Sequence, residues 1–496
     1  MKVLEVPGAL MGRNAVPVLV LAGVLILAVG FRAYGIDWDT GHTWTPHPDE
    51  RAIMMKVAEL ELPPFRQLGS LFDSDESPLN PRWFAYGSLP LYLLKACQVS
   101  ISTLLGLEMI DLRPVGRALS ILADVVTVAM IYFVGSAMYG RKVGLLAATL
   151  LATTVLHIQL SHFFTVDTML GLFAAITLYF LYSVAKYGRL KDSLLAGIFI
   201  GLGLATKISL LPIFLAFFVA HAIFLISALE TDLLHNKGLQ HLAARVAMGT
   251  ACGFGVSIVV FVVAQPYVLL DWSRFLTDVG EQSEMVRRIR DYPYTRQYID
   301  TTPYLYHIRQ LMTWGVGFPL GIMMWVGLVC ASMRGMKWRY GLGYLGLGIF
   351  LPALLLVFWS SVMAMVLACA LATIALLSTI PLRTQKSRPD LLIMAWIVPY
   401  FLVTGAFEVK FLRYMLPITP FLILLGSRML LYPYGASPRR WLAPKALVAV
   451  VLVLVLGSSV VYSVSYMSIY RAPHTSLRTA AWLQHNAPNG SLILKE

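Results

Sequence analysis

Apolar runs close to 20 residues long recur along almost the whole chain and dictate its architecture. A run of this length crosses the hydrocarbon core of a bilayer, about 30 Å thick, as a single helix. The short alternating segments that a membrane β-barrel needs are absent from the sequence. The sequence therefore predicts an all-α polytopic membrane protein. The expected spans are 14–31, 115–138, 143–160, 168–186, 193–206, 208–228, 243–264, 311–331, 341–359, 361–380, 391–406, 413–431 and 446–467.

Composition and charge agree with this interpretation. The chain is 58% hydrophobic and 13% charged, whereas about a quarter of the residues of an ordinary soluble chain are charged. A net charge of +13 would suggest nucleic acid in a soluble protein. Here the basic residues at span ends are expected to set orientation and to meet anionic headgroups, so no nucleic-acid partner is predicted. The four cysteines are scattered without a CxxC pair, which predicts neither a zinc site nor a disulfide framework.

One apolar segment, 87–107, is long enough to cross the membrane. A crossing there would add one span and move the later basic loops to the outer face, which argues against it. If it lies along the membrane surface and the N-terminus is cytoplasmic, five short basic loops face the cytoplasm, as the positive-inside rule favours. These loops contain Arg141/Lys142, Lys186/Arg189/Lys191, Arg334/Lys337/Arg339, Arg383/Lys386/Arg388 and Arg439/Arg440/Lys445. We therefore expect about 13 spans, with an interfacial helix in 87–107.

This orientation places two long loops on the outer face. The first, 32–113, is expected to carry juxtamembrane helices, and the second, 265–310, is rich in Tyr, Arg and acidic residues. Residues 1–468 then form one transmembrane domain. The polar segment 469–496 is expected to be an outer tail, and the start of a soluble domain is one interpretation of it.

Ionisable residues gather on the outer face, where each has a structural alternative. They are Asp49, Glu50, Asp167, Lys207, Lys410 and Arg413. Either aspartate is a plausible helix cap, and Glu50 a first-turn acid that compensates the helix dipole. The three cations are long side chains able to reach the interface.

Taken together, the same charges predict chemistry. Cations at an interface suit a phosphate, and a carboxylate suits a general base that removes a proton from an incoming hydroxyl. An apolar bundle suits a lipid tail. The combination indicates transfer of a group from a lipid phosphate to a hydroxyl or amine.

Other polar residues receive simpler interpretations. His47, His162 and His307 are expected to form hydrogen bonds rather than to ligate a metal. Asp124, inside the second span, either pairs with Arg117 or faces the bundle interior, and no chemistry is assigned to it.

Several motifs, in order along the chain, resemble those of one family. They are "HPDE", "WFAYGSLPLYLLK", "SHFFTVDTML", "GLGLATKISLLP", "QSEMVRRIRDYPYTRQYIDTTPYLYHIRQLMTWGVGFPLGI" and "FEVKFLRYMLPITPFLILL". The chain resembles the GT-C glycosyltransferases of the protein O-mannosyltransferase and aminoarabinose transferase type. The resemblance implies a GT-C fold and an inverting transfer from a polyprenyl- or dolichyl-phosphate sugar to an acceptor protein, lipid or glycan. It also implies a bacterial or archaeal plasma membrane, with the site on the extracytoplasmic face, 1–468 as catalytic domain and 265–310 as its cap.

The resemblance assigns roles residue by residue. Asp49 matches the proposed catalytic base and Glu50 its acidic neighbour. Asp167, together with the basic residues Lys207, Lys410 and Arg413, matches positions near the donor phosphate. No cofactor is assigned; for a divalent metal, the candidate ligands are Asp49, Asp167, His47 and His162.

The chain departs from the family at the start of the interfacial helix. Some relatives carry Lys-Pro-Pro or His-Pro-Pro where this chain reads Tyr86-Gly87-Ser88-Leu89-Pro90. Tyr86, Ser88 or Arg82 is the expected substitute. In the second outer loop, Arg296 and Tyr298 are candidates for binding sugar or acceptor, the alternative being an ordinary interfacial aromatic belt.

Two other functions remain open. A secondary transporter would place its charges along a path near the midplane, whereas these charges gather on one face. A flippase for lipid-linked sugars shares the same ligands but does not need Asp49.

Overall fold

The computed structural model describes most of the chain as a bundle of helices. It describes residues 15–40, 45–106, 111–230, 236–337, 362–431, 445–488 and 490–492, with Tyr340, Gly346, Gly348 and 350–352. The predicted span 341–359 lies largely outside these residues. The fold is all-helical, with 79% of the chain in helices and no strand among the described residues.

Helices occur where the apolar pattern predicts them. The N-terminal half contains α1 (Ala15–Ala33), α4 (Leu112–Tyr139), α5 (Arg141–Ala152), α6 (Val155–Ser161), α7 (Val166–Tyr187), α8 (Leu190–Leu204), α9 (Ile213–Glu230) and α10 (Asn236–Ala264). The C-terminal half contains α14 (Phe318–Met333), α16 (Val362–Ser378), α17 (Arg388–Gly405), α18 (Thr419–Leu431), α19 (Lys445–Met467) and α20 (Thr475–Asn486).

Seven helical segments among the described residues are long and apolar enough to cross a membrane. The predicted span 143–160 is instead a pair, α5 and α6, bent by 56°. The helices α14 and α18 are shorter apolar helices. The figure of about 13 spans therefore stays a prediction.

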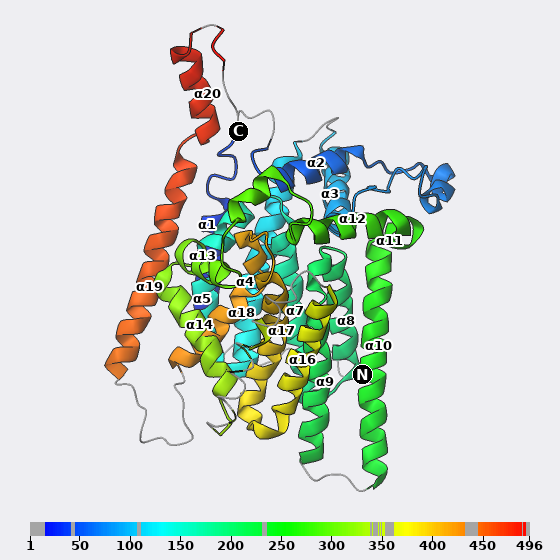
Figure 1. Ribbon diagram of the computed structural model, residues 1–496, viewed down its shortest axis with the longest axis vertical. Coiled ribbons are helices and arrows are strands. Elements are labelled where there is room, and N and C mark those ends of the chain that lie inside the picture. Colours follow the sequence, from blue (N-terminus) through cyan, green and yellow to red (C-terminus); the bar gives the residue numbers. More distant parts are fainter. Residues whose placement is uncertain are drawn as a thin grey trace.

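The predicted outer segments lie at one end of this bundle (Figure 1). They comprise α2 (Pro48–Glu59), α3 (Leu89–Leu105), α11 (Tyr267–Leu270) and α12 (Trp272–Val286), with α13 (Leu305–Gln310) nearby. The loop 265–310 is thus largely helical. The interfacial position of α3 remains a prediction, although its 17 residues fall short of a typical span.

The two outer segments are tied together by side-chain bonds. The Phe84 amide donates to Asp278 (2.7 Å), and the Asn80 amide donates to Asp271 (3.0 Å). Polar groups buried without partners are costly, so these bonds favour one arrangement of the two segments. They hold α12 over the loop that precedes α3.

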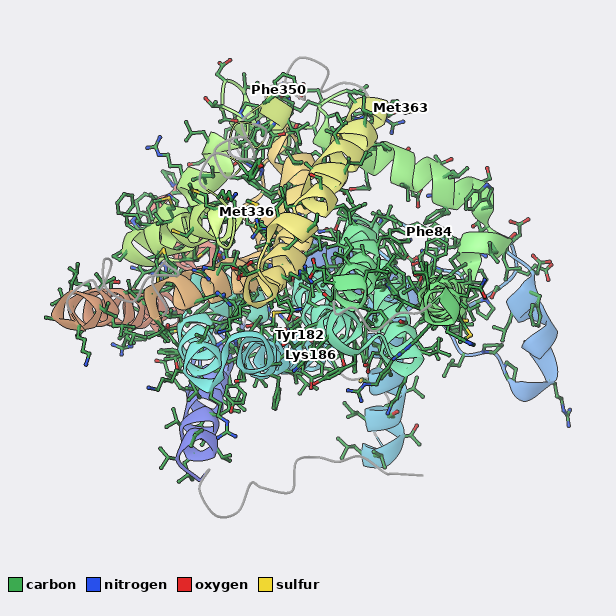
Figure 2. The ribbon with its side chains drawn as sticks, turned by 90° about the horizontal axis from the view of Figure 1, so that it is seen from below. Phe84, Tyr182, Lys186, Met336, Phe350 and Met363 are labelled. Atoms are coloured by element: carbon green, nitrogen blue, oxygen red, sulfur yellow. The ribbon has the colours of Figure 1, made fainter. Side chains whose placement is uncertain are left out.

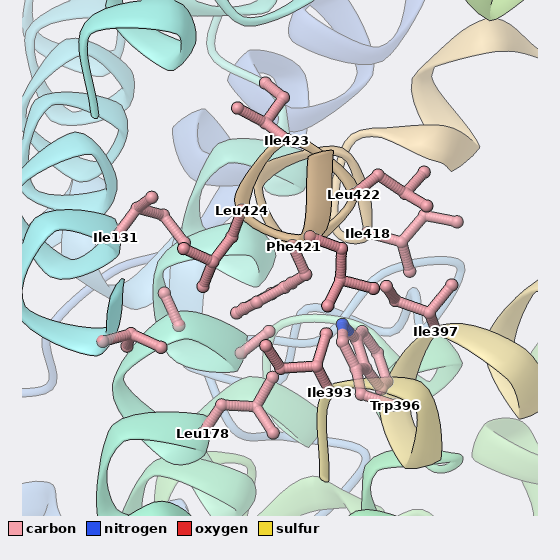
Figure 3. Close-up of a cluster of buried hydrophobic side chains, with 14 of the residues drawn as sticks. Ile131, Leu178, Ile393, Trp396, Ile397, Ile418, Phe421, Leu422, Ile423 and Leu424 are labelled. Atoms are coloured by element: carbon pink, nitrogen blue, oxygen red, sulfur yellow. The ribbon is translucent and has the colours of Figure 1, made fainter. Parts of the chain in front are cut away.

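The core lies between α4, α7, α17 and α18. Ile131, Leu178, Trp396 and Phe421 converge there (Figure 3), and all four are fully buried. Within a bilayer such side chains stabilise the bundle by close van der Waals packing, because lipid tails are as apolar as they are. This core fixes α7 and the segment leading into α18, which carry two of the charged residues described below.

Candidate active site

The first helix of the outer segment begins at the residues singled out by their charge. His47 caps α2: its Nδ1 accepts a hydrogen bond from the Asp49 amide (3.2 Å). Pro48 follows in the first turn, where its missing N–H costs nothing. The cap is therefore His47 and not Asp49, which leaves the Asp49 carboxylate available for other contacts. The expected cap Asp167 is likewise a first-turn residue, because Thr165 occupies the N-cap of α7.

Four predicted residues meet in one group, here called the acid–base cluster: Asp49, Asp167, Lys207 and Arg413. Arg413 lies 3.0 Å from the Asp49 carboxylate and 3.9 Å from that of Asp167. Lys207 donates to Asp167 over 2.8 Å. The side chains come from α2, the start of α7, the turn after α8, and the turn before α18, so the fold itself joins four distant segments.

Hydrogen bonding within the acid–base cluster is incomplete. The Asp49 Oδ2 has no hydrogen bond, although it lies 3.0 Å from Arg413, because the geometry of that ion pair is unfavourable for one. The Arg413 Nε also lacks a hydrogen bond, since the Asp167 carboxylate lies 3.9 Å from it. Buried charged groups usually satisfy every donor and acceptor, so these atoms retain capacity to bind a ligand.

Electrostatics in the cluster follow from burial and opposite charge. Burial alone would lower the pKa of Arg413, but Asp49 and other negative neighbours outweigh it and raise that pKa. The guanidinium is therefore permanently charged. The pKa of His47 is lowered, mainly by burial, so this cap is neutral near pH 7 and its Nδ1 can accept a hydrogen bond from the Asp49 amide.

A close backbone contact brings Tyr86 to the cluster. The Gly87 amide donates to the Thr206 carbonyl (3.0 Å), and a Cβ at Gly87 would collide with the Ala205 carbonyl. Glycine permits this approach. As a result, Lys207 lies 5.6 Å from the centre of the Tyr86 ring and 5.2 Å from that of Tyr414.

The other proposed substitutes for the missing lysine do not reach the cluster. The Arg82 side chain is exposed and bonds to the Asp75 carbonyl. Ser88 is buried, and its amide donates to Gln265 (3.2 Å). Of the three, only Tyr86 lies beside a member of the cluster.

Glu50 points away from Asp49 into a second charged group, here called the Arg117 clamp: Arg117, Glu50 and Asp39. Arg117 donates to both oxygens of Glu50 (2.9 Å each) and to both oxygens of Asp39 (2.7 Å each). Glu50 also accepts the Phe164 amide (2.9 Å). All three charged side chains are at most 2% exposed, so the structure does not bring Glu50 together with the acid–base cluster.

The remaining candidates lie apart from the acid–base cluster. Lys410 is buried and bonds to the Glu408 carbonyl (3.0 Å), with the Glu408 carboxylate 3.7 Å away. Arg296 is exposed and paired with Asp291 (2.8 Å). Tyr298 is buried against Phe411, with ring centres 5.5 Å apart.

Phe411 links Tyr298 to the cluster without direct contact. The Arg413 guanidinium lies 4.3 Å from the centre of the Phe411 ring. Tyr298 is therefore a packing neighbour of the residue that holds Arg413, whereas Arg296 and Lys410 belong to other groups.

The histidine candidates are engaged in other contacts. Each ring nitrogen of His162 lies within hydrogen-bonding distance of a backbone carbonyl, that of Ile158 (2.8 Å) or Tyr34 (2.9 Å), and the neutral ring donates to one of them. Among the described residues, no group of three or more His, Cys, Asp or Glu side chains is arranged to hold a metal ion. Of the candidate metal ligands, Asp49 and Asp167 are the two that lie next to the same residue, Arg413.

The expected hydrogen-bonding role fails for His307. It is fully buried, and neither ring nitrogen has a hydrogen bond of normal geometry, only a loose contact with the Thr404 carbonyl. Burial first, and then the charge of Lys410, lowers the pKa of His307 to about 4.

Asp124 does not pair with Arg117. It faces the bundle interior, where Arg32 Nε and His157 Nδ1 each lie 2.6 Å from one of its oxygens. Arg117 is instead engaged by Glu50 and Asp39. The spacing of Asp124 and Arg117 on one helix suggested their pairing, but partners from other segments are closer in the fold.

A separate cavity of about 470 Å³ lies at the opposite end of the bundle. Its lining, as far as the described part of the chain forms it, includes neither a member of the acid–base cluster nor a carboxylate. Acids and cations meet at the acid–base cluster, whereas the described residues that line the cavity include no carboxylate able to act as a general base.

Comparisons with known proteins agree with this architecture. Residues 109–270 match the family described as dolichyl-phosphate-mannose-protein mannosyltransferase. The structure of ArnT from Cupriavidus metallidurans bound to undecaprenyl phosphate is similar, with 15% identity and a TM-score of 0.50 over 96% of this chain and 73% of that one. No curated protein matches the chain significantly.

A second similar structure is the archaeal oligosaccharyltransferase AglB from Archaeoglobus fulgidus, in complex with an inhibitory peptide and a dolichol-phosphate. It has 13% identity and a TM-score of 0.47 over 96% of this chain. The chain spans only 58% of the length of that protein.

The fold is thus that of the membrane-embedded GT-C class. Within that fold class, the match to the dolichyl-phosphate-mannose-protein mannosyltransferase family covers residues 109–270, which is less than half of the chain.

Proposed function

We propose that the chain is an inverting glycosyltransferase that takes its sugar from a polyprenyl- or dolichyl-phosphate donor. The observation that carries this proposal is the acid–base cluster, in which Arg413 contacts both Asp49 and Asp167. The family match and the ArnT structure bound to undecaprenyl phosphate support a lipid-phosphate donor. The acceptor is a hydroxyl of a protein, lipid or glycan.

The proposed reaction needs one base and one phosphate-binding group. Asp49 takes the proton of the acceptor hydroxyl while its oxygen bonds to the anomeric carbon, on the face opposite the phosphate. The bond between that carbon and the phosphate oxygen breaks, and its electron pair leaves with the lipid phosphate. Such a single displacement inverts the anomeric centre, and it needs no second carboxylate as a nucleophile.

Lys207 and Arg413 are proposed to bind the phosphate and to stabilise the charge that grows on it. Stabilisation that increases in the transition state accelerates the reaction, unlike uniform binding of the donor. In the described structure both cations contact carboxylates, so donor binding is expected to draw Arg413 away from Asp49. This exchange would free the base when the phosphate arrives.

Glu50 is proposed to be a positioning residue rather than a catalytic one. It accepts the Phe164 amide, three residues before Asp167, and it follows Asp49 directly. Arg117 holds it from α4. The clamp thereby fixes α2, which carries Asp49, against the segment that carries Asp167.

Location follows from the charge distribution. We place the acid–base cluster on the extracytoplasmic face of a bacterial or archaeal plasma membrane, because the predicted basic loops face the cytoplasm. Residues 1–468 form the proposed catalytic domain, with 265–310 as its cap. The bonds between α12 and the first outer segment support the capping role.

The deciding experiment uses purified protein in lipid with a panel of polyprenyl-phosphate sugars, and it measures release of polyprenyl phosphate. We expect release with one sugar donor and its loss in Asp49→Asn. Asp75→Asn, an exposed acid of the same outer segment, is the matched control and should retain activity. Absence of release from every donor, with lipid-linked sugar still crossing the bilayer, would favour the flippase alternative.

A further inference from the structure

The cavity at the opposite end of the bundle lies one membrane thickness from the acid–base cluster. Helix α7 begins at the cluster with Asp167 and ends at the cavity with Lys186. A rise of about 1.5 Å per residue puts these two positions about 28 Å apart, close to the hydrocarbon thickness of about 30 Å. Figure 2, which views this end, shows Tyr182 and Lys186 there.

The walls of the cavity are apolar and its rim is cationic. Ala185, Ile223, Phe224 and Leu392 contribute apolar walls between α7, α9 and α17. The rim carries the exposed Lys186, whose Nζ lies 5.8 Å from the centre of the Tyr182 ring and 5.0 Å from that of the Tyr187 ring. An apolar groove beside a charged rim matches a molecule with an acyl chain and a charged head.

Arg388 supplies the observation that points to a ligand. It lines the cavity, is 4% exposed, and its Nε has no hydrogen-bond partner. Its other nitrogens donate to Ser227 (2.5 Å) and to Glu230 (2.5 and 2.6 Å). A buried guanidinium donor without a partner is costly, and phosphate is a group that arginine binds well.

The balance of charge around the cavity is positive despite Glu230. Arg245 lies behind Phe224, 5.2 Å from its ring centre, and donates to the carbonyls of Tyr187 and Gly188. The Arg245 charge thus lies at the C-terminus of α7 and offsets the negative end of the helix dipole. Helix α17 also begins at the cavity with Arg388, and the N-terminus of an 18-residue helix favours an anion.

We propose that this cavity binds the phosphate headgroup of an anionic phospholipid from the surrounding bilayer. Lys186 and Arg388 would contact the phosphate, while an acyl chain would lie along Ile223 and Phe224. A phospholipid fits better than a free phosphate because most of the walls are apolar and the cavity is at interface depth. This inference is independent of the proposed transfer reaction.

Native mass spectrometry of the purified full chain in detergent tests the proposal. The protein is titrated with phosphatidylglycerol, phosphatidylcholine, polyprenyl phosphate and inorganic phosphate. We expect selective retention of phosphatidylglycerol and a loss of affinity of about tenfold in Lys186→Gln, since one hydrogen bond to a charged group is removed. Lys191→Gln, which removes an exposed charge at the same end, is the matched control and should bind as the wild type does.

A second variant tests the cavity itself. Ala185→Leu adds volume at the apolar wall without changing charge, and it should also weaken retention of phosphatidylglycerol. Equal retention of phosphatidylglycerol and phosphatidylcholine, or equal losses in Lys186→Gln and Lys191→Gln, would overturn the proposal. So would tighter binding of inorganic phosphate or of polyprenyl phosphate than of phosphatidylglycerol.

Discussion

Asp49 and Glu50 are adjacent in the sequence, yet they belong to groups of opposite character. Asp49 is 16% exposed and has an oxygen without a hydrogen bond. Glu50 is fully buried, and both of its oxygens accept bonds from Arg117. A helix turns by about 100° per residue, so neighbours on α2 face different surroundings.

The difference shows how to separate chemistry from architecture when charges gather. In the Arg117 clamp, both carboxylates are paired with the same guanidinium, and such closed networks make structure specific and rigid. In the acid–base cluster, Asp49 and Arg413 retain unused hydrogen-bonding atoms. Retained capacity is what a site needs to exchange its internal contacts for contacts with a substrate.

The largest expected effect separates Asp49 from Glu50 by the same chemical change. Asp49→Asn should lower the rate of sugar transfer by about 10²–10⁴, the usual contribution of a general base, and should leave the apparent melting temperature almost unchanged. Glu50→Gln should instead cost about 1.5–3 kcal/mol of stability, because it weakens charge-assisted bonds. Initial rates and thermal unfolding in detergent measure both. Equal loss of activity at equal stability in the two variants would show that Glu50 takes part in the reaction.

Removing the centre of the clamp should destabilise the fold. Arg117→Met leaves Glu50 and Asp39 buried without a countercharge, which costs about 3–5 kcal/mol. The triple variant Arg117→Met/Glu50→Gln/Asp39→Asn removes those charges and should recover part of the lost stability. Thermal unfolding of the two variants is the measurement. If the triple variant is no more stable than Arg117→Met, the clamp does not act as a charge network.

Most of the helices were predictable because bilayer thickness sets their length, and their apolar runs can be read locally. Span parity predicted Asp49, Asp167, Lys207 and Arg413 on one face of the membrane. The structure brings the four side chains together, and the face itself stays a prediction. The bend between α5 and α6 was not, since an apolar run of 18 residues looks the same whether straight or broken.

The pairing of the buried charges around Arg117 could not be predicted in the same way. Arg117 was considered only as a partner of Asp124 on its own helix, whereas its partners Asp39 and Glu50 come from other segments. An arginine within an apolar helix was the available signal, because such a residue demands a partner. The sequence alone does not say which acid is close enough, and three acids were candidates.

A third prediction distinguishes the cations of the cluster from Lys410. Lys207→Gln should weaken donor binding by about tenfold, because one bond to the phosphate is lost. Lys410→Gln should change donor binding little, since Lys410 bonds to Glu408 and contacts no member of the cluster. Donor KM in the release assay measures both variants. A larger effect at Lys410 would place the phosphate on the other side of Arg413.

The last expected effect concerns the pH dependence of stability that arises from buried His307, the pKa of which Lys410 helps to lower. His307 has its ordinary pKa of about 6.5 when unfolded and a pKa of about 4 when folded. Between pH 6.5 and pH 4, His307 therefore binds a proton in the unfolded chain but stays neutral in the folded chain. Stability should fall by about 1.4 kcal/mol for each pH unit from 6.5 down to about 4, and then level off.

His307→Gln should remove this part of the pH dependence, while the lowered pKa of His47 leaves a residual slope of the same sign. Apparent melting temperatures at pH 7.5 and pH 5.5 compare the two proteins. The same slope in both would mean that His307 does not titrate on unfolding. A melting temperature that depends less on pH in the variant, with donor KM unchanged at pH 7.5, would show that buried His307 affects folding and not donor binding.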